Sequence, residues 1–226
     1  MADYDRRELR AITISVACGL AAAVTGAGAW SEFGDASSAT AAASLSRTAL
    51  LRYAPFAGAH PAHGIVVAKT VRGTCWTSAL TDWRSAAWRC FGPGSVIHDP
   101  CFSSPSQRLN YVLCPLYTPS SPVLRIELTK PLPKPAGRDD TFHHPPWSIQ
   151  LDSGTWCISR GGINGIPSVH GNDVTYLCQR ATTNNASQFG DAGVLVGSPR
   201  RSSPGWTIER ATGQRITTVN VRSAWW

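Results

Sequence analysis

The stretch Val123-Leu-Arg-Ile-Glu-Leu-Thr129 decides the fold class, because apolar and polar residues alternate along it without a break. Successive side chains of a β-strand point to opposite faces of the sheet, so this alternation places Leu124, Ile126 and Leu128 on one face. The stretch therefore predicts a β-strand with one buried face.

Two β-hairpins are predicted farther along the chain. Residues 148–151 and 155–158 flank Asp152-Ser153-Gly154, whose residue types favour a tight turn. Residues 206–210 and 215–221 flank a second, glycine-containing turn. Further strands are expected at residues 65–71, 95–98, 111–114, 173–178 and 193–197.

About nine or ten short strands separated by turns are typical of a β-sandwich or a β-barrel. We therefore expect an all-β domain over residues 64–226, with helix limited to a turn or two within residues 78–87. The 226-residue chain has 15% charged residues, 20 Gly, 16 Pro and 9 Trp. This composition excludes a coiled coil, a long-helix bundle and a highly charged disordered protein.

Five prolines interrupt the strand pattern between residues 130 and 146. Because proline lacks a backbone N–H, this stretch is expected to be a long connection and not a central strand. It separates two possible sub-modules, residues 64–130 with four cysteines and residues 146–226 with two.

An even number of cysteines in the expected domain is typical of a disulfide framework in an exported protein. Six cysteines allow fifteen pairings, and the sequence alone does not choose among them. Proximity along the chain favours three pairs, Cys75–Cys90, Cys101–Cys114 and Cys157–Cys178. A zinc site is the alternative, but no Cys-x2-Cys or His-x3–5-His spacing occurs, so neither a metal nor a cofactor is expected.

The N-terminus has the pattern of an export signal. Three arginines within the first ten residues precede the uncharged run 11–30, which as a helix is long enough to cross a bilayer core of roughly 30 Å. The positive flank predicts that the residues downstream lie outside the plasma membrane. The sequence Ala27-Gly28-Ala29 favours cleavage of a signal peptide, and an uncleaved membrane anchor is the alternative.

Residues 31–63 are rich in Ala and Ser and show no strong apolar face. We expect them to form a spacer between the N-terminal segment and the β domain. The domain is therefore predicted to be extracellular or in the cell envelope. Contact with a membrane is expected only through residues 11–30, if these stay uncleaved.

The formal net charge of +7 falls entirely on the part after residue 29, because the first 29 residues hold three Arg and three acidic residues. Arginine beside exposed tryptophan binds anionic groups and stacks on rings. An exported protein rarely meets nucleic acid, so an anionic wall polymer, a glycan or an envelope protein is the expected partner. The candidate binding residues are Trp83, Arg84, Trp88, Arg89, Arg200, Arg201 and Trp206. The competing interpretation is a basic, solvated surface with the tryptophans packed in the core.

No catalytic motif accompanies the acids and bases of the sequence, and no nucleophile elbow occurs. We therefore expect a non-catalytic binding or sensing module at the cell envelope, with no catalytic residues. The alternative is a cell-envelope hydrolase with an Asp/His site, tested at His98 and Asp99. A simpler role for Asp99 is to cap a turn before Pro100. His143 and His144 are expected in an exposed loop and not at a metal.

Short motifs occur in a fixed order along the chain: Cys75-Trp-Thr-Ser, Ala87-Trp-Arg-Cys90, Asp99-Pro-Cys-Phe102, Leu113-Cys-Pro115, Leu132-Pro133, Pro146-Trp147, Gly154-Thr-Trp-Cys157, Tyr176-Leu-Cys178 and Ala224-Trp225. Together they resemble exported or membrane-anchored six-cysteine domain proteins of actinobacteria. They are also similar to the extracellular module of some bacterial serine/threonine kinases. The resemblance covers roughly residues 70–226. It implies export, disulfides and an extracellular sensing or binding role, and it provides no catalytic residue to carry over.

Overall fold

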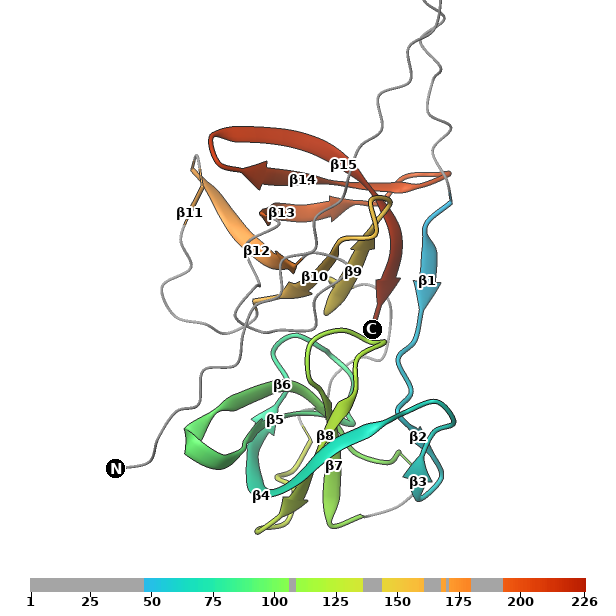
Figure 1. Cartoon of the computed structure of the whole chain (residues 1–226), viewed down its shortest axis with the longest axis vertical. Helices are drawn as coiled ribbons and strands as arrows, with labels where there is room; N and C mark the ends of the chain where they lie inside the picture. The colour runs from blue at the N-terminus through green and yellow to red at the C-terminus, as the bar shows by residue number, and fades with distance from the viewer. Residues whose placement is uncertain (1–46, 106–108, 136–143, 161–167, 170, 180–192) are drawn as a thin grey trace, which may run out of the picture. The chain divides into compact units, whose positions relative to one another are not determined.

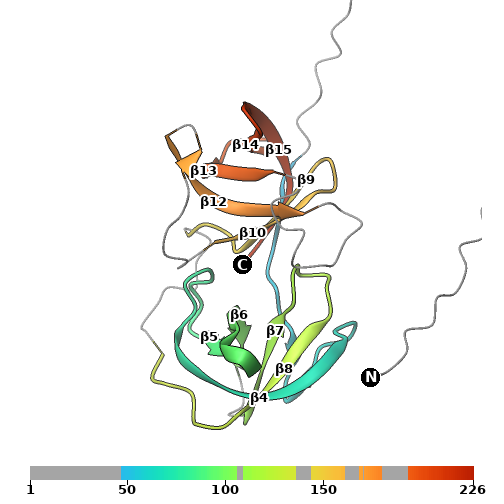
Figure 2. The ribbon, with the colours of Figure 1, turned by 60° about the vertical axis from the view of Figure 1, so that its left-hand side comes forward.

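Strands make up nearly all the regular structure of the chain (Figures 1 and 2). The computed structural model describes residues 47–105, 109–135, 144–160, 168–169, 171–179 and 193–226. The strands are β1 (Ala49–Leu51), β2 (Phe56–Ala57), β3 (His60–Pro61), β4 (Val67–Ser78), β5 (Ala87–Phe91), β6 (Ile97–Phe102), β7 (Tyr111–Pro115), β8 (Val123–Leu128), β9 (Ser148–Leu151), β10 (Trp156–Ser159), β11 (Ser168–Val169), β12 (Asn172–Gln179), β13 (Val194–Arg200), β14 (Trp206–Thr212) and β15 (Arg215–Trp225). The predicted all-β class is confirmed.

The predicted export segment lies outside the described residues. Within the described ranges, no helix is long and apolar enough to cross a membrane. Residues Ala43–Trp226 form one compact unit. All three disulfides and all the core clusters given below belong to it, so this unit contains the contacts expected of an independently folding domain.

The first sub-module is a closed five-stranded barrel of β4, β5, β6, β7 and β8. Each strand runs antiparallel to the next, so the first and fifth strands point the same way. The barrel must therefore close through a parallel pair, and β4 and β8 form it with Val71 opposite Ile126. In Figure 2 the long strand β4 curves around the other strands of this barrel.

The second sub-module is a meander of six strands, β9, β10, β12, β13, β14 and β15. With an even number of strands the first and last run in opposite directions, and β15 pairs antiparallel with β9, so the sheet closes on itself. Strand β11 adds to β12, and β1 adds to β15 as a parallel strand.

The three disulfide pairs are those favoured by proximity along the chain, and each joins neighbouring strands of one sheet. They connect β4 with β5 (Cys75–Cys90), β6 with β7 (Cys101–Cys114) and β10 with β12 (Cys157–Cys178). The first and third pairs are also directly opposite in the strand register. The predicted disulfide framework is confirmed.

The buried face predicted for β8 is confirmed. Leu124 and Ile126 belong to the core cluster of the first barrel, and Leu128 packs against it. Val123 points the other way and is buried in a separate cluster with Tyr111. This strand therefore has apolar contacts on both faces at its start and on one face farther along.

Residues 47–63 were expected to be spacer, but they belong to the folded unit. The buried Thr48 hydroxyl donates a hydrogen bond to the carbonyl of Val221 (2.7 Å) and accepts one from the backbone N–H of Trp206 (2.7 Å). Tyr53 is also buried, and its N–H donates to the carbonyl of Trp226 (2.7 Å). The domain boundary at residue 64 is thus too late, because a strand of three residues is too short to show a periodic pattern.

The helix expected within residues 78–87 does not form. Strand β4 runs to Ser78, and the loop that follows is held by Asp99 of β6, whose carboxylate accepts hydrogen bonds from Leu80 N–H (3.0 Å) and the Thr81 hydroxyl (2.7 Å). In the described residues the only helical element is the three-residue 3-10 turn Pro93–Ser95.

The two barrels share a buried aromatic cluster. Phe102 of the first barrel and Trp147, next to β9 of the second, both pack near the Tyr53 ring, with centroids 5.2 and 5.5 Å from it. The Pro-rich connection predicted between the sub-modules therefore joins two barrels that are also in direct contact.

Candidate functional site

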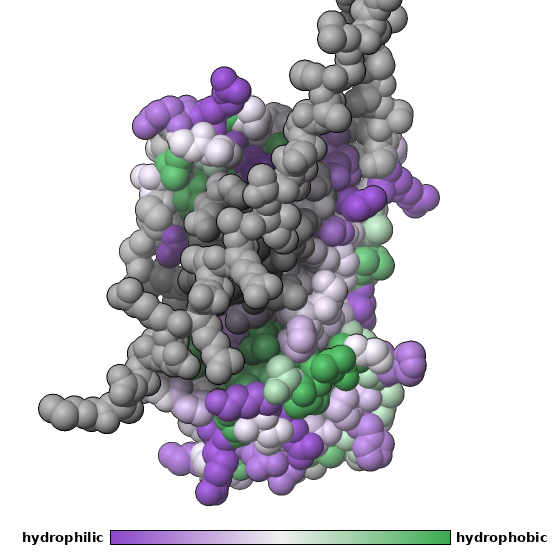
Figure 3. All heavy atoms as spheres, in the orientation of Figure 1, coloured by the Kyte–Doolittle hydropathy of each residue, from purple (hydrophilic) through white to green (hydrophobic). Residues whose placement is uncertain are grey.

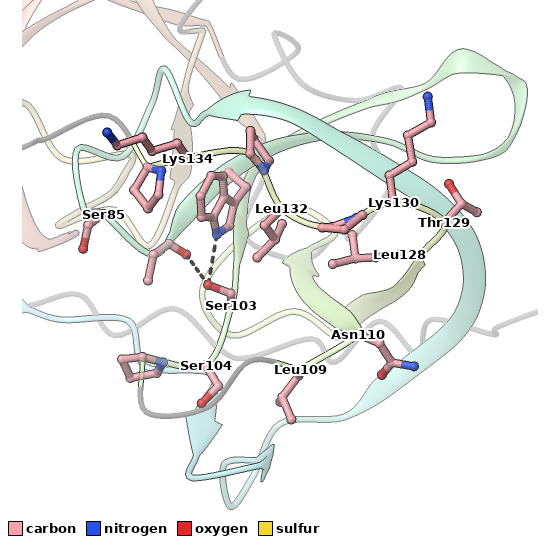
Figure 4. A pocket seen from close by; sticks show the side chains of 16 residues that line it. Ser85, Ser103, Ser104, Leu109, Asn110, Leu128, Thr129, Lys130, Leu132 and Lys134 are labelled. Atoms are coloured by element: carbon pink, nitrogen blue, oxygen red, sulfur yellow. Dashed lines mark hydrogen bonds between the residues drawn. The ribbon is translucent and has the colours of Figure 1, made fainter.

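A groove of about 810 Å³ lies at one end of the five-stranded barrel (Figure 4). It is bounded by the residues that precede β5 and β7 and by those that follow β6 and β8. The lining residues are Ser85, Ala86, Trp88, Ser103, Ser104, Pro105, Leu109, Asn110 and residues 128–135.

The floor of the groove is the buried indole of Trp88, which is only 3% exposed. Its Nε1–H donates a hydrogen bond to the Ser103 hydroxyl (3.0 Å), which lies 3.5 Å from the carbonyl oxygen of Ala86. The polar atom of the indole is thus satisfied, and the remaining ring surface is apolar. Trp88 belongs to the same core cluster as two of the disulfides, so the floor is fixed to the barrel core.

One wall of the groove is residues 129–135, which we call the strap. At its start, the N–H and the hydroxyl of Thr129 both donate to the carbonyl of Gly73, at 2.8 and 3.0 Å. Alternate prolines remove backbone donors from the strap, which prevents it from continuing the sheet. Leu132 anchors the middle of the strap by packing against the core of the barrel.

Two lysines give the groove its charge. Lys130 and Lys134 are both exposed, and Figure 4 shows them at the two ends of the strap with Leu132 between them. The other polar lining groups are the hydroxyls of serine and threonine and the amide of Asn110. The described lining residues include no Asp, Glu, His or Cys. The groove therefore suits an anionic, hydroxyl-bearing ligand.

Of the seven predicted binding residues, only Trp88 lines this groove. Arg84 instead has a structural role beside the aromatic cluster of Tyr53 and Phe102. It pairs with Asp82 (2.8 Å), donates to the carbonyl of Tyr53 and lies 4.4 Å from the centre of the Phe102 ring. Its side chain is 13% exposed, which leaves little of it for a ligand.

Three of the predicted residues meet around His144. The ring of Trp83 stacks on that of His144 at 3.9 Å, and the guanidinium of Arg201 donates to the His144 carbonyl (2.8 Å). Arg201 also lies 4.9 Å from the centre of the Trp206 ring. The structure thus groups Trp83, Arg201 and Trp206, although they come from different barrels.

The two remaining arginines lie elsewhere. Arg89 is 5.5 Å from the Trp76 ring and 3.7 Å from the Asp99 carboxylate, whereas Arg200 pairs with Glu209 at 3.0 Å on the second barrel. The seven residues therefore do not form one binding surface.

The alternative Asp/His site is split between two sides of a strand. His98 is directly opposite the core residue Cys90, and because side chains alternate along β6, Asp99 faces the other way. Burial raises the pKa of Asp99, and this effect outweighs the hydrogen bonds from Thr81 and Leu80, which lower it. Burial lowers the pKa of His98. Asp99 thus holds the loop after β4. The simpler interpretation was wrong about the turn, because Asp99 and Pro100 lie within strand β6.

No group of three or more His, Cys, Asp or Glu side chains within the described ranges is arranged to hold a metal ion. His143 lies outside the described residues. His144 is engaged by Trp83 and Arg201 as given above.

The sequence interpretation missed both groove lysines. The chain has only three lysines beside 18 arginines, and two of the three stand in Lys130-Pro-Leu-Pro-Lys134. This local concentration was the available signal. Comparison with protein-family models, with curated proteins and with solved structures found no match.

Proposed function

We propose that residues 43–226 are a non-catalytic binding domain that works outside the plasma membrane, at the cell envelope, and takes an anionic wall polymer or acidic glycan in the barrel groove. The observation that carries this proposal is the groove itself, with Lys130 and Lys134 at the two ends of its strap and no carboxylate among its described lining residues.

The groove has a residue type suited to contact each chemical group of such a ligand. Lysine ammonium groups attract phosphate or carboxylate groups, and the serine and threonine hydroxyls exchange hydrogen bonds with a polyol or a sugar. Leu128 and Leu132 supply apolar surface for the ligand's carbon skeleton, and the buried Trp88 supports them from below. Three disulfides in a folded domain are compatible with an oxidising, extracytoplasmic location.

The test is sedimentation of oxidised residues 43–226 with isolated cell-wall sacculi across a salt series. The double variant Lys130→Gln/Lys134→Gln should bind about tenfold more weakly, because two charge-assisted contacts are lost. The matched control is Lys69→Gln, which removes an exposed lysine of β4 that does not line the groove. The binding that remains should depend less on salt.

Two results would contradict the proposal that the groove binds an anionic wall polymer or acidic glycan. Either the domain fails to bind sacculi at low salt, or the double variant binds as tightly as the Lys69 control. Release of soluble wall fragments that stops in an Asp99→Asn or His98→Asn variant would instead favour the hydrolase alternative.

A further inference from the structure

Apolar side chains gather on the outer face of the first barrel, at the β5–β6 hairpin. Val96 and Ile97 are 53% and 46% exposed, and Trp76 on β4 is 38% exposed. Residues at hairpin tips are usually polar or turn-forming, so two branched aliphatic side chains here are unusual. This tip joins the end of β5 to the start of β6, at the opposite end of these strands from the groove.

Trp76 and Ile97 are connected through Phe91, and Val96 precedes Ile97 in the chain. Ile97 is directly opposite Phe91 in the β5–β6 register, and the Phe91 ring stacks on Trp76 at 4.0 Å with 16° between the planes. We call Trp76, Phe91, Val96 and Ile97 the outer-face patch. In Figure 3 green apolar and purple polar surface alternate over the described part of the molecule, so the residues of the patch are taken from their exposure and contacts. A contiguous exposed apolar patch is typical of an interaction site.

Positive charge borders the patch. The exposed Arg72 lies on the same face of β4 as Thr74 and Trp76. The guanidinium of Arg89 lies 5.5 Å from the Trp76 ring, but its side chain is only 14% exposed and pairs with Asp99. The nearest carboxylates are engaged: Asp99 binds the loop after β4 and its side chain is 7% exposed.

A second carboxylate, Glu127, is opposite Arg72 in the β4–β8 register. It lies 3.6 Å from Arg125 on its own strand. Asp99 and Glu127 therefore balance Arg89 and Arg125, and the exposed Arg72 leaves the border of the patch with a net positive charge.

We propose that the outer-face patch docks on the surface of a lipid bilayer that contains anionic headgroups. Aliphatic side chains at a hairpin tip insert into the interface, tryptophan prefers the headgroup level, and arginine binds lipid phosphates. The sixteen residues 31–46 span at most about 55 Å when extended. If residues 11–30 stay uncleaved as a membrane anchor, this length holds the domain within reach of the bilayer. This inference does not depend on the groove.

The experiment is flotation of oxidised residues 43–226 with phosphatidylcholine vesicles, with and without phosphatidylglycerol. The wild-type domain should float with the anionic vesicles, and Val96→Gln/Ile97→Gln should lower the partition constant about tenfold or more, because two inserted side chains are lost. The matched control is Leu50→Gln on β1, since Leu50 is 46% exposed, as Ile97 is. Circular dichroism checks that all three proteins are folded.

The Lys130→Gln/Lys134→Gln variant should float with anionic vesicles as the wild type does. The two experiments therefore test ligand binding in the groove and membrane binding by the outer-face patch separately. The proposal is overturned if the domain does not bind anionic vesicles, or if Val96→Gln/Ile97→Gln floats as well as the Leu50 control. It is also overturned if this variant loses only its binding to sacculi, which would make the patch a platform for wall glycans.

Discussion

The two barrels have cores of nearly equal size but different chemistry. The main cluster of the five-stranded barrel has nine buried residues, four of which are half-cystines. The cluster of the six-stranded barrel has ten, of which two are half-cystines and the others include Tyr176, Leu195, Ile208 and Trp226. The smaller barrel thus depends more on cross-links, and the larger one more on the burial of apolar side chains.

Both barrels close through segments that are distant in sequence. The five-stranded barrel closes through the parallel β4–β8 pair, with Val71 opposite Ile126, and the six-stranded barrel through the antiparallel β9–β15 pair, with Ile149 opposite Ala224. Bringing distant segments together costs chain entropy in each barrel. Disulfides shorten the free loops and reduce this cost, and the first barrel has two of them against one in the second. The groove and the outer-face patch both lie on this cross-linked barrel, where a rigid frame holds exposed binding residues in place.

The largest expected effect is the loss of stability when the disulfides of one barrel are removed, because the two barrels should respond differently. Replacing all four cysteines of the first barrel by alanine should lower the free energy of unfolding by about 6 kcal/mol, because each loop contributes about 3 kcal/mol. That loss is comparable to the whole stability of a typical domain. Cys157→Ala/Cys178→Ala should cost about 3 kcal/mol and leave both barrels folded. Native-state hydrogen exchange measures the protection of β5–β8 and β12–β14 separately. Equal loss of protection in both barrels in the four-alanine variant would refute the comparison.

A smaller effect tests the closure of the first barrel at Gly73. A Cβ added there would collide with the backbone oxygen of Phe91 and lie 2.8 Å from Cγ2 of Ile126, so Gly73→Ala should cost about 3 kcal/mol. Gly213→Ala is the control in the second barrel: Gly213 has φ +58° and open space around it, and the change should cost about 1 kcal/mol. Chemical denaturation measures both, and a cost for Gly73→Ala no larger than that of the control would show that β4 can shift away from β5.

Local patterns were sufficient where the structure is local. The alternation of Leu124, Ile126 and Leu128 predicted their shared face, and short loops predicted the disulfide pairs. Strand β5 was missed because Arg89 is the only polar residue in Ala87–Phe91, so the sequence does not alternate even though burial does from Trp88 to Phe91. The parallel closure was missed because it depends on distant pairing, which no local window contains.

The candidate site was predictable only in part, for a similar physical reason. Trp88 was proposed as a binding residue from its arginine neighbours, and it lines the groove, but its indole is buried and Arg89 points to Trp76. The groove is assembled from segments that precede or follow four strands. An exposed lysine such as Lys134 has no periodic signature, since nothing in its local sequence requires its position.

The smallest expected effect is a pH dependence in the first barrel, at His98. Burial lowers the pKa of this imidazole, so the folded state binds fewer protons than the unfolded state as the pH falls below the ordinary value of 6.5. The stability linked to His98 is thus fully present above pH 6.5 and is lost as the pH falls toward the lowered pKa. Asp99 acts in the opposite sense at lower pH, because its raised pKa favours the folded state as the carboxyl takes up a proton. His98→Asn should therefore flatten the pH dependence of the free energy of unfolding just below pH 6.5, measured by denaturant titration. An unchanged slope in this variant would place the titrating group elsewhere in the chain, and the pH dependence would then not distinguish the first barrel from the second.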